Sequence, residues 1–297
     1  MKYVVSLEEH GMSLLAFLKE KSKGAYSTKS LKQAIALKAC KVGGKIESFS
    51  SRKLSQGEEV EFVFSSLEKE DLTITICYQD EDFVVVDKSF GIVCLPEEFI
   101  KYLGSKANLW RPVHRLDKDT SGLVLLAKNS KAEEAAKKLF STRSISKLYL
   151  AIVEGKLSCK RGVIDNFLGK KGGYQGQTLY GSVPEKEGMR AVTHYHLLAQ
   201  SKDSSLLLCD LKTGRTHQIR VHLSELNHPI LGDSQYAKKA FLCSYEPKRH
   251  LLHAWKLSFT HPFTQENIEL TAPIPADFNN ALKSLSLKWD GKFKEIV

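Results

Sequence analysis

The sequence predicts an α+β fold with a largely antiparallel mixed sheet and flanking helices, preceded by a small separate unit. Strand-like segments outnumber helical ones, and few strand–helix–strand units occur along the chain. A polar stretch at residues 65–71 separates two regions of regular apolar spacing. With 297 residues, the chain is long enough for two unequal domains. We therefore expect a first domain at 1–66, a linker at 67–79 and a larger domain at 80–297.

In the first domain, apolar residues at helical spacing predict helices within "MSLLAFLKEK" (12–21) and "STKSLKQAIALKA" (27–39). The paired glycines of "KVGGKI" (41–46) indicate a turn. The alternation in "GEEVEFVF" (57–64) is typical of a strand. This domain is thus predicted to be a small α+β unit.

The larger domain begins with "LTITICYQDEDFVVVDKSFG" (72–91), which predicts two strands joined by an acidic turn. A helix is expected over 128–140, where Ser130 and Glu133 have the spacing of a capping box. A second, shorter helix is expected over 216–226, beginning at Arg215 or Thr216. The remaining strands are expected within 147–155, 191–200, 205–214, 250–262 and 267–275.

The composition favours a polyanionic partner. The net charge is +10 and the isoelectric point is near 9.1, which suits nucleic acid or an anionic membrane surface. The sequence has no apolar run of the roughly 20 residues that a membrane-spanning helix needs. Its six cysteines form no CxxC pair, and no secretory segment is recognisable at the start. We therefore expect reduced thiols, a cytoplasmic location and nucleic acid as the partner.

The stretch "HRLDKDTSGLVLLAK" (114–128) places acids among bases immediately before an apolar run. Positive charges beside a carboxylate favour its ionised form, which suits a nucleophile or a charge stabiliser better than a general acid. The Thr-Ser-Gly tripeptide can supply hydroxyl and backbone donors. A polar turn before a buried strand would explain the same pattern, and local chemistry does not distinguish Asp117 from Asp119.

This stretch closely resembles the central motif of the RluA-type family of RNA pseudouridine synthases, His-Arg-Leu-Asp-x-x-Thr-Ser-Gly. In that family the acid of the motif is the catalytic nucleophile, which corresponds to Asp117 here. "KLYLAIVEG" resembles the motif that supplies an active-site tyrosine, here Tyr149. "LKTGRTHQIRVHL" followed by "HPILGD" resembles the third motif, whose arginine pairs with the catalytic acid and corresponds here to Arg215.

The resemblance covers roughly residues 80–275 and implies conversion of uridine to pseudouridine in RNA, without a cofactor because substrate and product are isomers. A stacked uridine must be flipped out of the RNA first. Asp117 would attack the anomeric carbon or the uracil ring, or assist removal of a ribose proton. Arg115 would fill the vacated space and Tyr149 would stack on the uracil. Contacts to substrate RNA are expected from His114, Arg115, Thr120, Lys147, Gln218 and Arg220.

The first 66 residues resemble the small alpha-L RNA-binding domain, although "SLL" from Ser13 stands where that domain usually has Arg-Leu-Asp. Basic residues here could bind phosphates. They are Lys29, Lys32, Lys38, Lys41, Lys45, Arg52 and Lys53. In the catalytic part, Ser89, Leu95 and Ala237 depart from the family's proline, histidine and glycine. We expect a monomer acting on RNA, with large-subunit ribosomal RNA favoured over transfer RNA.

Three other functions are weighed. Histidine pairs such as His194 and His196 lack the further ligands that a metal site needs. A glycoside hydrolase would need two cooperating carboxylates, and Asp119 is the only acid near Asp117. A non-catalytic RNA-binding or ribosome-assembly factor would share the basic charge, but it would not need the set of Asp117, Tyr149 and Arg215.

Overall fold

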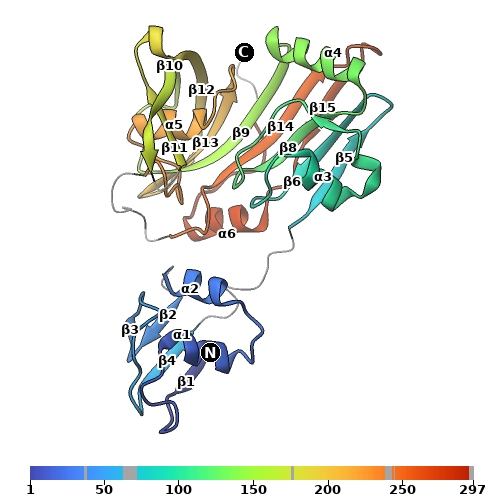
Figure 1. Ribbon diagram of the computed structural model, residues 1–297. Coiled ribbons are helices and arrows are strands. Elements are labelled where there is room, and N and C mark those ends of the chain that lie inside the picture. Colours follow the sequence, from blue (N-terminus) through green and yellow to red (C-terminus); the bar gives the residue numbers. More distant parts are fainter. Residues whose placement is uncertain (37–38, 63–71, 175–176, 238–242, 244, 294–297) are drawn as a thin grey trace. The chain divides into compact units, whose positions relative to one another are not determined.

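The computed structural model describes residues 1–36, 39–62, 72–174, 177–237, 243 and 245–293 (Figure 1). The chain divides into two compact units, Met1–Asp71 and Leu72–Val297. Residues 74–79, which the sequence assigned to a linker, instead form strand β5 (Ile74–Gln79) of the larger unit. The larger unit therefore begins before residue 80, because β5 pairs along its length with the next strand, β6 (Phe83–Lys88).

The first unit contains a four-stranded antiparallel sheet in the order β1-β4-β2-β3. Its strands are β1 (Lys2–Val4), β2 (Cys40–Val42), β3 (Lys45–Ile46) and β4 (Glu59–Phe62), and its helices are α1 (Leu14–Lys21) and α2 (Thr28–Ala36). Helix α1 begins where Ser13 accepts a hydrogen bond from the Ala16 backbone N–H, at 3.2 Å. Side chains of both helices and the sheet form one separate apolar core, which stabilises this unit.

The larger unit is built on an eleven-stranded mixed sheet. Its main path runs β11-β10-β12-β13-β9-β14-β8-β6-β5, with β15 paired to β14 and β7 paired to β8. The remaining strands are β7 (Arg111–Pro112), β8 (Ser121–Ala127), β9 (Ile145–Glu154), β10 (Arg161–Tyr174), β11 (Gln177–Ser182), β12 (Met189–Gln200), β13 (Ser204–Leu211), β14 (Leu252–Thr260) and β15 (Asn267–Thr271). The pairing of β14 with β8 is parallel and the others are antiparallel, which confirms the predicted mixed, largely antiparallel sheet.

The central strands are buried on both faces. In β8, Val124 and Leu126 belong to one apolar cluster, while Leu123 and Leu125 belong to another on the opposite face. Helix α4 (Ser130–Ser141) covers the second face, whereas α3 (Pro96–Leu103) and α6 (Ala276–Ser284) pack on the first. Figure 1 shows β9, β14 and β8 side by side at the centre of this unit.

Two helix starts differ from the sequence prediction. Helix α4 is capped by Asn129, whose side chain accepts from the Ala132 N–H at 2.8 Å, so Ser130 is the first helical residue and not the cap. Helix α5 (Gln218–Glu225) starts later than Arg215 or Thr216, because His217 adopts a left-handed conformation with φ of 56°. Arg215 therefore lies before the helix and Arg220 within it, and both line the pocket described below.

All six cysteines are free thiols. Across the described part of the chain, no helix is both long enough and apolar enough to span a membrane.

Candidate active site

Asp117 lies in the turn that leads into β8. The Thr120 backbone N–H donates to the Asp117 carbonyl oxygen at 3.1 Å, which closes the turn. The next residues, from Ser121, enter a strand that is buried along its whole length. The apolar run of the motif therefore anchors the turn in the core and leaves the Asp117 side chain free to face a pocket.

Gly122 allows the turn to meet β14. Its φ is +113°, and a Cβ placed there would lie 2.2 Å from the Ala254 carbonyl oxygen. Only glycine fits this close approach and this backbone conformation. The contact is part of the parallel pairing in which His253 and Ala254 face Ser121 and Gly122.

Buried basic side chains hold the turn from below. The Lys88 ammonium is fully buried and donates to the carbonyls of Ser89, Lys118 and Thr120, at 3.0, 3.2 and 2.7 Å. Arg249 donates to the Asp119 carbonyl at 3.0 Å and pairs with Asp277 of α6. These contacts bind the backbone carbonyls of the turn to buried cations, and the Lys118 carbonyl also accepts from the Gly91 N–H at 2.8 Å.

Two histidines complete this support. His250 Nε2 and Thr120 Oγ1 form a hydrogen bond of 2.8 Å, and His253 Nδ1 bonds with Ser121 Oγ at 3.0 Å. Burial lowers the pKa of both imidazoles to about 3. Both rings are therefore neutral at physiological pH, and the turn rests on a framework whose charges are carried by Lys88 and Arg249.

The turn opens onto a pocket of about 580 Å³ whose lining includes Asp117, Tyr149, Arg215 and Arg220. Arg220 Nη1 donates to Asp117 Oδ2 at 3.0 Å. The same guanidinium binds Asp233 through two hydrogen bonds of 2.7 and 2.9 Å. Arg220 and Asp233 are only 7% and 1% exposed, so this arginine is fixed by one carboxylate while it orients the other.

The Arg220 guanidinium stays protonated although it is buried. Desolvation by itself would lower its pKa, but the hydrogen bonds and negative charges of Asp233 and Asp117 outweigh that effect and raise it. Asp117 thus faces a permanently charged partner whose position does not depend on substrate.

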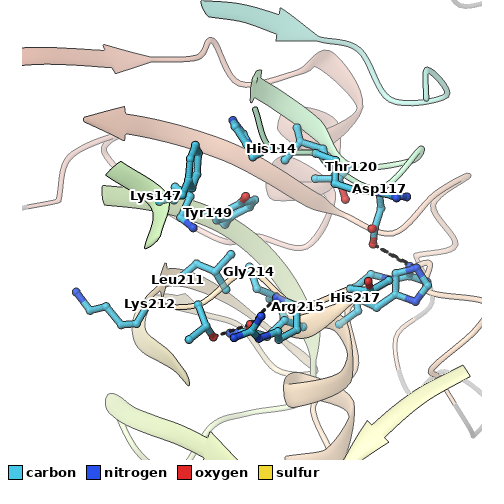
Figure 2. Close-up of a pocket in the computed structure, with 18 of the residues that line it drawn as sticks. His114, Asp117, Thr120, Lys147, Tyr149, Leu211, Lys212, Gly214, Arg215 and His217 are labelled. Carbon is cyan, nitrogen blue, oxygen red and sulfur yellow. Dashed lines mark hydrogen bonds and ion pairs between the residues drawn. The ribbon is translucent and has the colours of Figure 1, made fainter. Parts of the chain in front are cut away.

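His217 and Tyr236 flank the same carboxylate. His217 Nε2 lies 3.8 Å from Asp117 Oδ2 (Figure 2). Its Nδ1 bonds with the Tyr236 hydroxyl at 2.8 Å. Burial lowers the pKa of His217, with the Asp117 charge opposing the shift. The imidazole is therefore neutral at physiological pH, and it lines this end of the pocket with a polar ring.

Tyr149 enters the pocket from β9. It is 6% exposed, and burial followed by the charge of Asp117 raises the pKa of its phenol. Figure 2 shows Tyr149 and Asp117 directed into the same pocket from different elements. The site thus presents a carboxylate and a neutral aromatic face together.

The amino-acid sequence also matches known proteins. Residues 82–225 match the model of the RNA pseudouridylate synthase family. The chain is 35% identical over 232 residues to the uncharacterized RNA pseudouridine synthase YlyB of Bacillus subtilis, covering 73% of this chain and 74% of that protein. The chain belongs to the RNA pseudouridine synthases. It is also 34% identical to ribosomal large subunit pseudouridine synthase D of Zymomonas mobilis, over 74% of this chain and 75% of that one.

The fold agrees with this family. Human RNA pseudouridylate synthase domain containing 4 superposes with a TM-score of 0.58 at 27% identity, covering 72% of this chain and 94% of that one. Human RNA pseudouridylate synthase domain containing 1 gives 0.59 at 25% identity, with 74% and 97% covered. Members of the family isomerise uridine to pseudouridine in RNA. In this pseudouridine synthase the candidate catalytic groups are the pocket residues Asp117, Tyr149 and Arg220.

The arginine that pairs with Asp117 was assigned wrongly from the sequence. In the structure Arg220 makes that ion pair, while Arg215 Nε donates to the Arg190 carbonyl at 3.2 Å. Figure 2 shows Arg215 apart from Asp117, with His217 lying nearer. Helix α5 begins only at Gln218, so Arg215 lies before the helix. Arg220 lies within the helix and reaches Asp117. Arg215 remains a pocket-lining residue.

Among the predicted RNA contacts, two have a structural role. Gln218 is 2% exposed, and its amide bonds with Thr213, Thr193 and backbone groups. Thr120 is equally buried and bonded to His250. Neither side chain has a free polar atom to offer RNA, so both act by shaping the pocket wall.

Other predicted contacts do face the pocket. Arg115, His114 and Lys147 line it, and within the described residues Arg115 makes no hydrogen bond or ion pair. His114 Nε2 accepts from the Leu125 backbone N–H at 2.9 Å. Burial lowers the pKa of Lys147 to about 8. These three groups line the pocket.

In the first unit, the predicted phosphate-binding residues divide into three groups. Lys32, Lys41, Lys45 and Lys53 are exposed. Arg52 is engaged by Glu47 and Glu58, at 3.1 and 2.7 Å, so it is not free for phosphate as the sequence suggested. Lys38 lies outside the described residues, and the structure describes helix α2 around Lys29 but not that side chain.

Several site residues were not anticipated from the sequence. Lys88 and Arg249 hold the turn, whereas Asp233 and Tyr236, three residues apart, bind Arg220 and His217. Asp233 ends the HPILGD segment of the third motif, but the resemblance gave it no role. The described residues contain no group of three histidine, cysteine or acidic side chains that could hold a metal.

Proposed function

We propose that this enzyme isomerises specific uridines of large-subunit ribosomal RNA to pseudouridine in the cytoplasm, with Asp117 as the catalytic group. The observation that carries the proposal is the Asp117 carboxylate, held by the buried Arg220 opposite Tyr149 in a pocket with a basic rim. Relatives named as acting on the ribosomal large subunit support that substrate class. Six free thiols suit a reducing compartment.

The reaction breaks the bond between the ribose anomeric carbon and uracil N1 and forms a bond from the same carbon to uracil C5. The C5 proton leaves and N1 gains one, so atoms and electrons balance without a cofactor. Asp117 attacks the anomeric carbon or the uracil ring, or takes a ribose proton, and Arg220 orients it for each of these steps. Tyr149 stacks on the flipped uracil and excludes water from its face.

Base flipping leaves a gap in the RNA, and we assign Arg115 to fill it. Its guanidinium is exposed, lies two residues before Asp117 and is not committed to another described group. A planar guanidinium can stack between bases and donate hydrogen bonds at the same time. Unstacking costs a few kcal/mol, which such contacts offset.

Replacing Asp117 tests the assignment. Asp117→Asn keeps the side-chain shape and removes the carboxylate, so pseudouridine formation in ribosomal RNA from cells lacking this gene should be abolished while binding persists. Asp119→Asn is the matched control, because Asp119 does not line the pocket and contacts the framework through its carbonyl. Normal turnover by Asp117→Asn, measured by chemical mapping of pseudouridine, would refute the proposal. Release of free uracil would instead favour a hydrolase.

The first unit is assigned to RNA binding on its exposed lysines and separate core. A chain starting at Leu72 should bind ribosomal RNA roughly tenfold more weakly, since a few lost phosphate contacts change affinity by that order. The single-turnover rate at saturating RNA should change little, because the pocket residues all belong to the larger unit. Unaltered affinity would exclude this unit as an RNA anchor.

A further inference from the structure

The pocket extends beyond the groups needed for one flipped uridine. Its wall also includes Lys137, Phe140 and Ser141 of α4, together with Arg143 just after that helix. None of these residues contacts Asp117 or Arg220 through a hydrogen bond or an ion pair in the described structure. This arm of the pocket, which we call the α4 wall, is therefore available for a different part of the substrate.

Phe140 is the aromatic residue of the α4 wall. It is half-buried and packs at its base on the apolar cluster that α4 covers. The His114 ring lies 5.1 Å from it, centroid to centroid, at 41°, and the Lys147 ammonium lies 5.3 Å from its centroid. Proteins stack nucleic-acid bases on aromatic side chains that lie in positively charged grooves, and Phe140 lies in a pocket wall with Lys147 over its ring.

Lys147 has no fixed partner. In the described part of the chain its ammonium makes no hydrogen bond and no ion pair, and its close contact is the Phe140 ring. A half-buried ammonium without an acceptor is costly unless an anion arrives. An RNA phosphate beside the stacked base would supply that anion and draw the ammonium off the ring.

His114 contributes a fixed donor. Because its Nε2 accepts from the Leu125 backbone N–H, the ring proton is on Nδ1. Burial lowers the pKa of this imidazole to about 3, so the ring stays neutral at physiological pH. His114 is thus held as a neutral N–H donor beside the Phe140 ring.

A neighbouring cavity of about 450 Å³ is a poorer place for RNA. It shares Arg143, Leu211 and Lys212 with the main pocket, but Asp210 and Glu269 also line it. Asp210 already neutralises Lys212 at 2.6 Å. Because carboxylates repel phosphates, the α4 wall suits the RNA strand better than this second cavity.

We propose that Phe140 stacks the base next to the target uridine in the same RNA strand, with His114 at the base edge and Lys147 on the adjoining phosphate. This inference rests on the proposed function and adds a second nucleotide subsite to it. The occupant is a nucleobase, because the wall combines an aromatic face, a neutral donor and a cation within one pocket.

Phe140→Leu tests the subsite, with Phe263→Leu as a matched control. Both phenylalanines pack on the same apolar cluster and have a lysine ammonium over the ring, but Phe263 does not line the pocket. With ribosomal RNA from cells lacking this gene, Phe140→Leu should raise the half-saturating RNA concentration roughly tenfold, as expected for loss of one stacked base. Phe140→Tyr, which keeps a ring that can stack, should lose much less affinity than Phe140→Leu, and Phe263→Leu should change neither affinity nor rate.

Abasic substitution identifies the stacked base. In an RNA fragment that contains the mapped target, the base on each side of the uridine is removed in turn. Wild-type enzyme should lose affinity about tenfold at one of the two positions, whereas Phe140→Leu should show no additional loss there.

Equal affinities for wild type and Phe140→Leu would overturn the subsite, as would an undiminished abasic effect in that variant. Equal losses in Phe140→Leu and Phe263→Leu would also overturn it by assigning Phe140 to packing alone. Wild-type enzyme that forms no pseudouridine would instead overturn the proposed function, so the two failures are distinguishable.

Discussion

The two ends of the pocket treat charge in opposite ways. At the Asp117 end each charged group is committed, since Arg220 bridges Asp117 and the buried Asp233. At the rim, Arg115 and Lys147 make no hydrogen bond or ion pair within the described residues. The difference separates two tasks, because a group that must act on a bond has to be positioned before substrate arrives. A group that contacts the RNA itself, whether a phosphate or the neighbouring bases, can be left for the substrate to pair.

Replacing Arg220 removes the bridge between Asp117 and Asp233 and should have the largest effect on the reaction rate. Arg220→Lys keeps the charge but loses the planar fork that bridges two carboxylates, so the single-turnover rate should fall about 100-fold, as expected for a misplaced catalytic group. Arg215→Lys is the same change five residues earlier and should cost only a few-fold. Melting curves of both variants serve as the control that each one is folded. A larger loss for Arg215→Lys would reverse the assignment of the two arginines.

The pH dependence of stability tests the buried histidines that support the Asp117 turn. Burial lowers the pKa of His250 and His253 to about 3. In the unfolded chain these imidazoles bind protons near pH 6.5, whereas in the folded chain they do not, so stability is full above pH 6.5 and is lost as pH falls towards 3. At pH 5 the loss should be roughly 2 kcal/mol for each histidine.

Tryptophan fluorescence during urea unfolding measures this loss in the larger unit, which contains Trp110, Trp255 and Trp289. His253→Gln should show a smaller decrease in unfolding free energy between pH 7 and pH 5 than the wild-type chain. Stability that is independent of pH over this range would show that these imidazoles titrate normally in the fold.

The salt dependence of RNA affinity separates the roles of two arginines at the rim, and these changes should have the smallest effects. Arg115→Gln should lower the single-turnover rate several-fold without changing the salt dependence of RNA affinity, because its planar group replaces a base and not a counterion. Arg143→Gln should do the reverse, reducing the slope of log affinity against log salt by about one. A changed slope for Arg115→Gln would make it a phosphate contact and not the residue that fills the gap.

Much of this site could be predicted from the sequence, but not the connections within it. The motif and its resemblance identified Asp117 and Tyr149 as pocket residues, and the strand that carries Tyr149, expected within 147–155, is β9 (Ile145–Glu154). The pairing arginine was misplaced because it depends on where α5 begins, and a left-handed His217 has no clear sequence signal. Lys88 was missed because its partners are backbone carbonyls, which every residue has.

The close approach of β14 to Gly122 has a consequence for synthesis of the enzyme. The turn that contains Asp117 is held by Arg249 and His250, which follow their partners by 130 residues in the chain. A ribosome therefore makes Asp117 long before it makes the residues that hold its turn. Since contacts of such sequence separation form late, a nascent or truncated chain that ends before β14 has the central motif but not the contacts that hold it. We therefore expect activity only in chains that extend through β14.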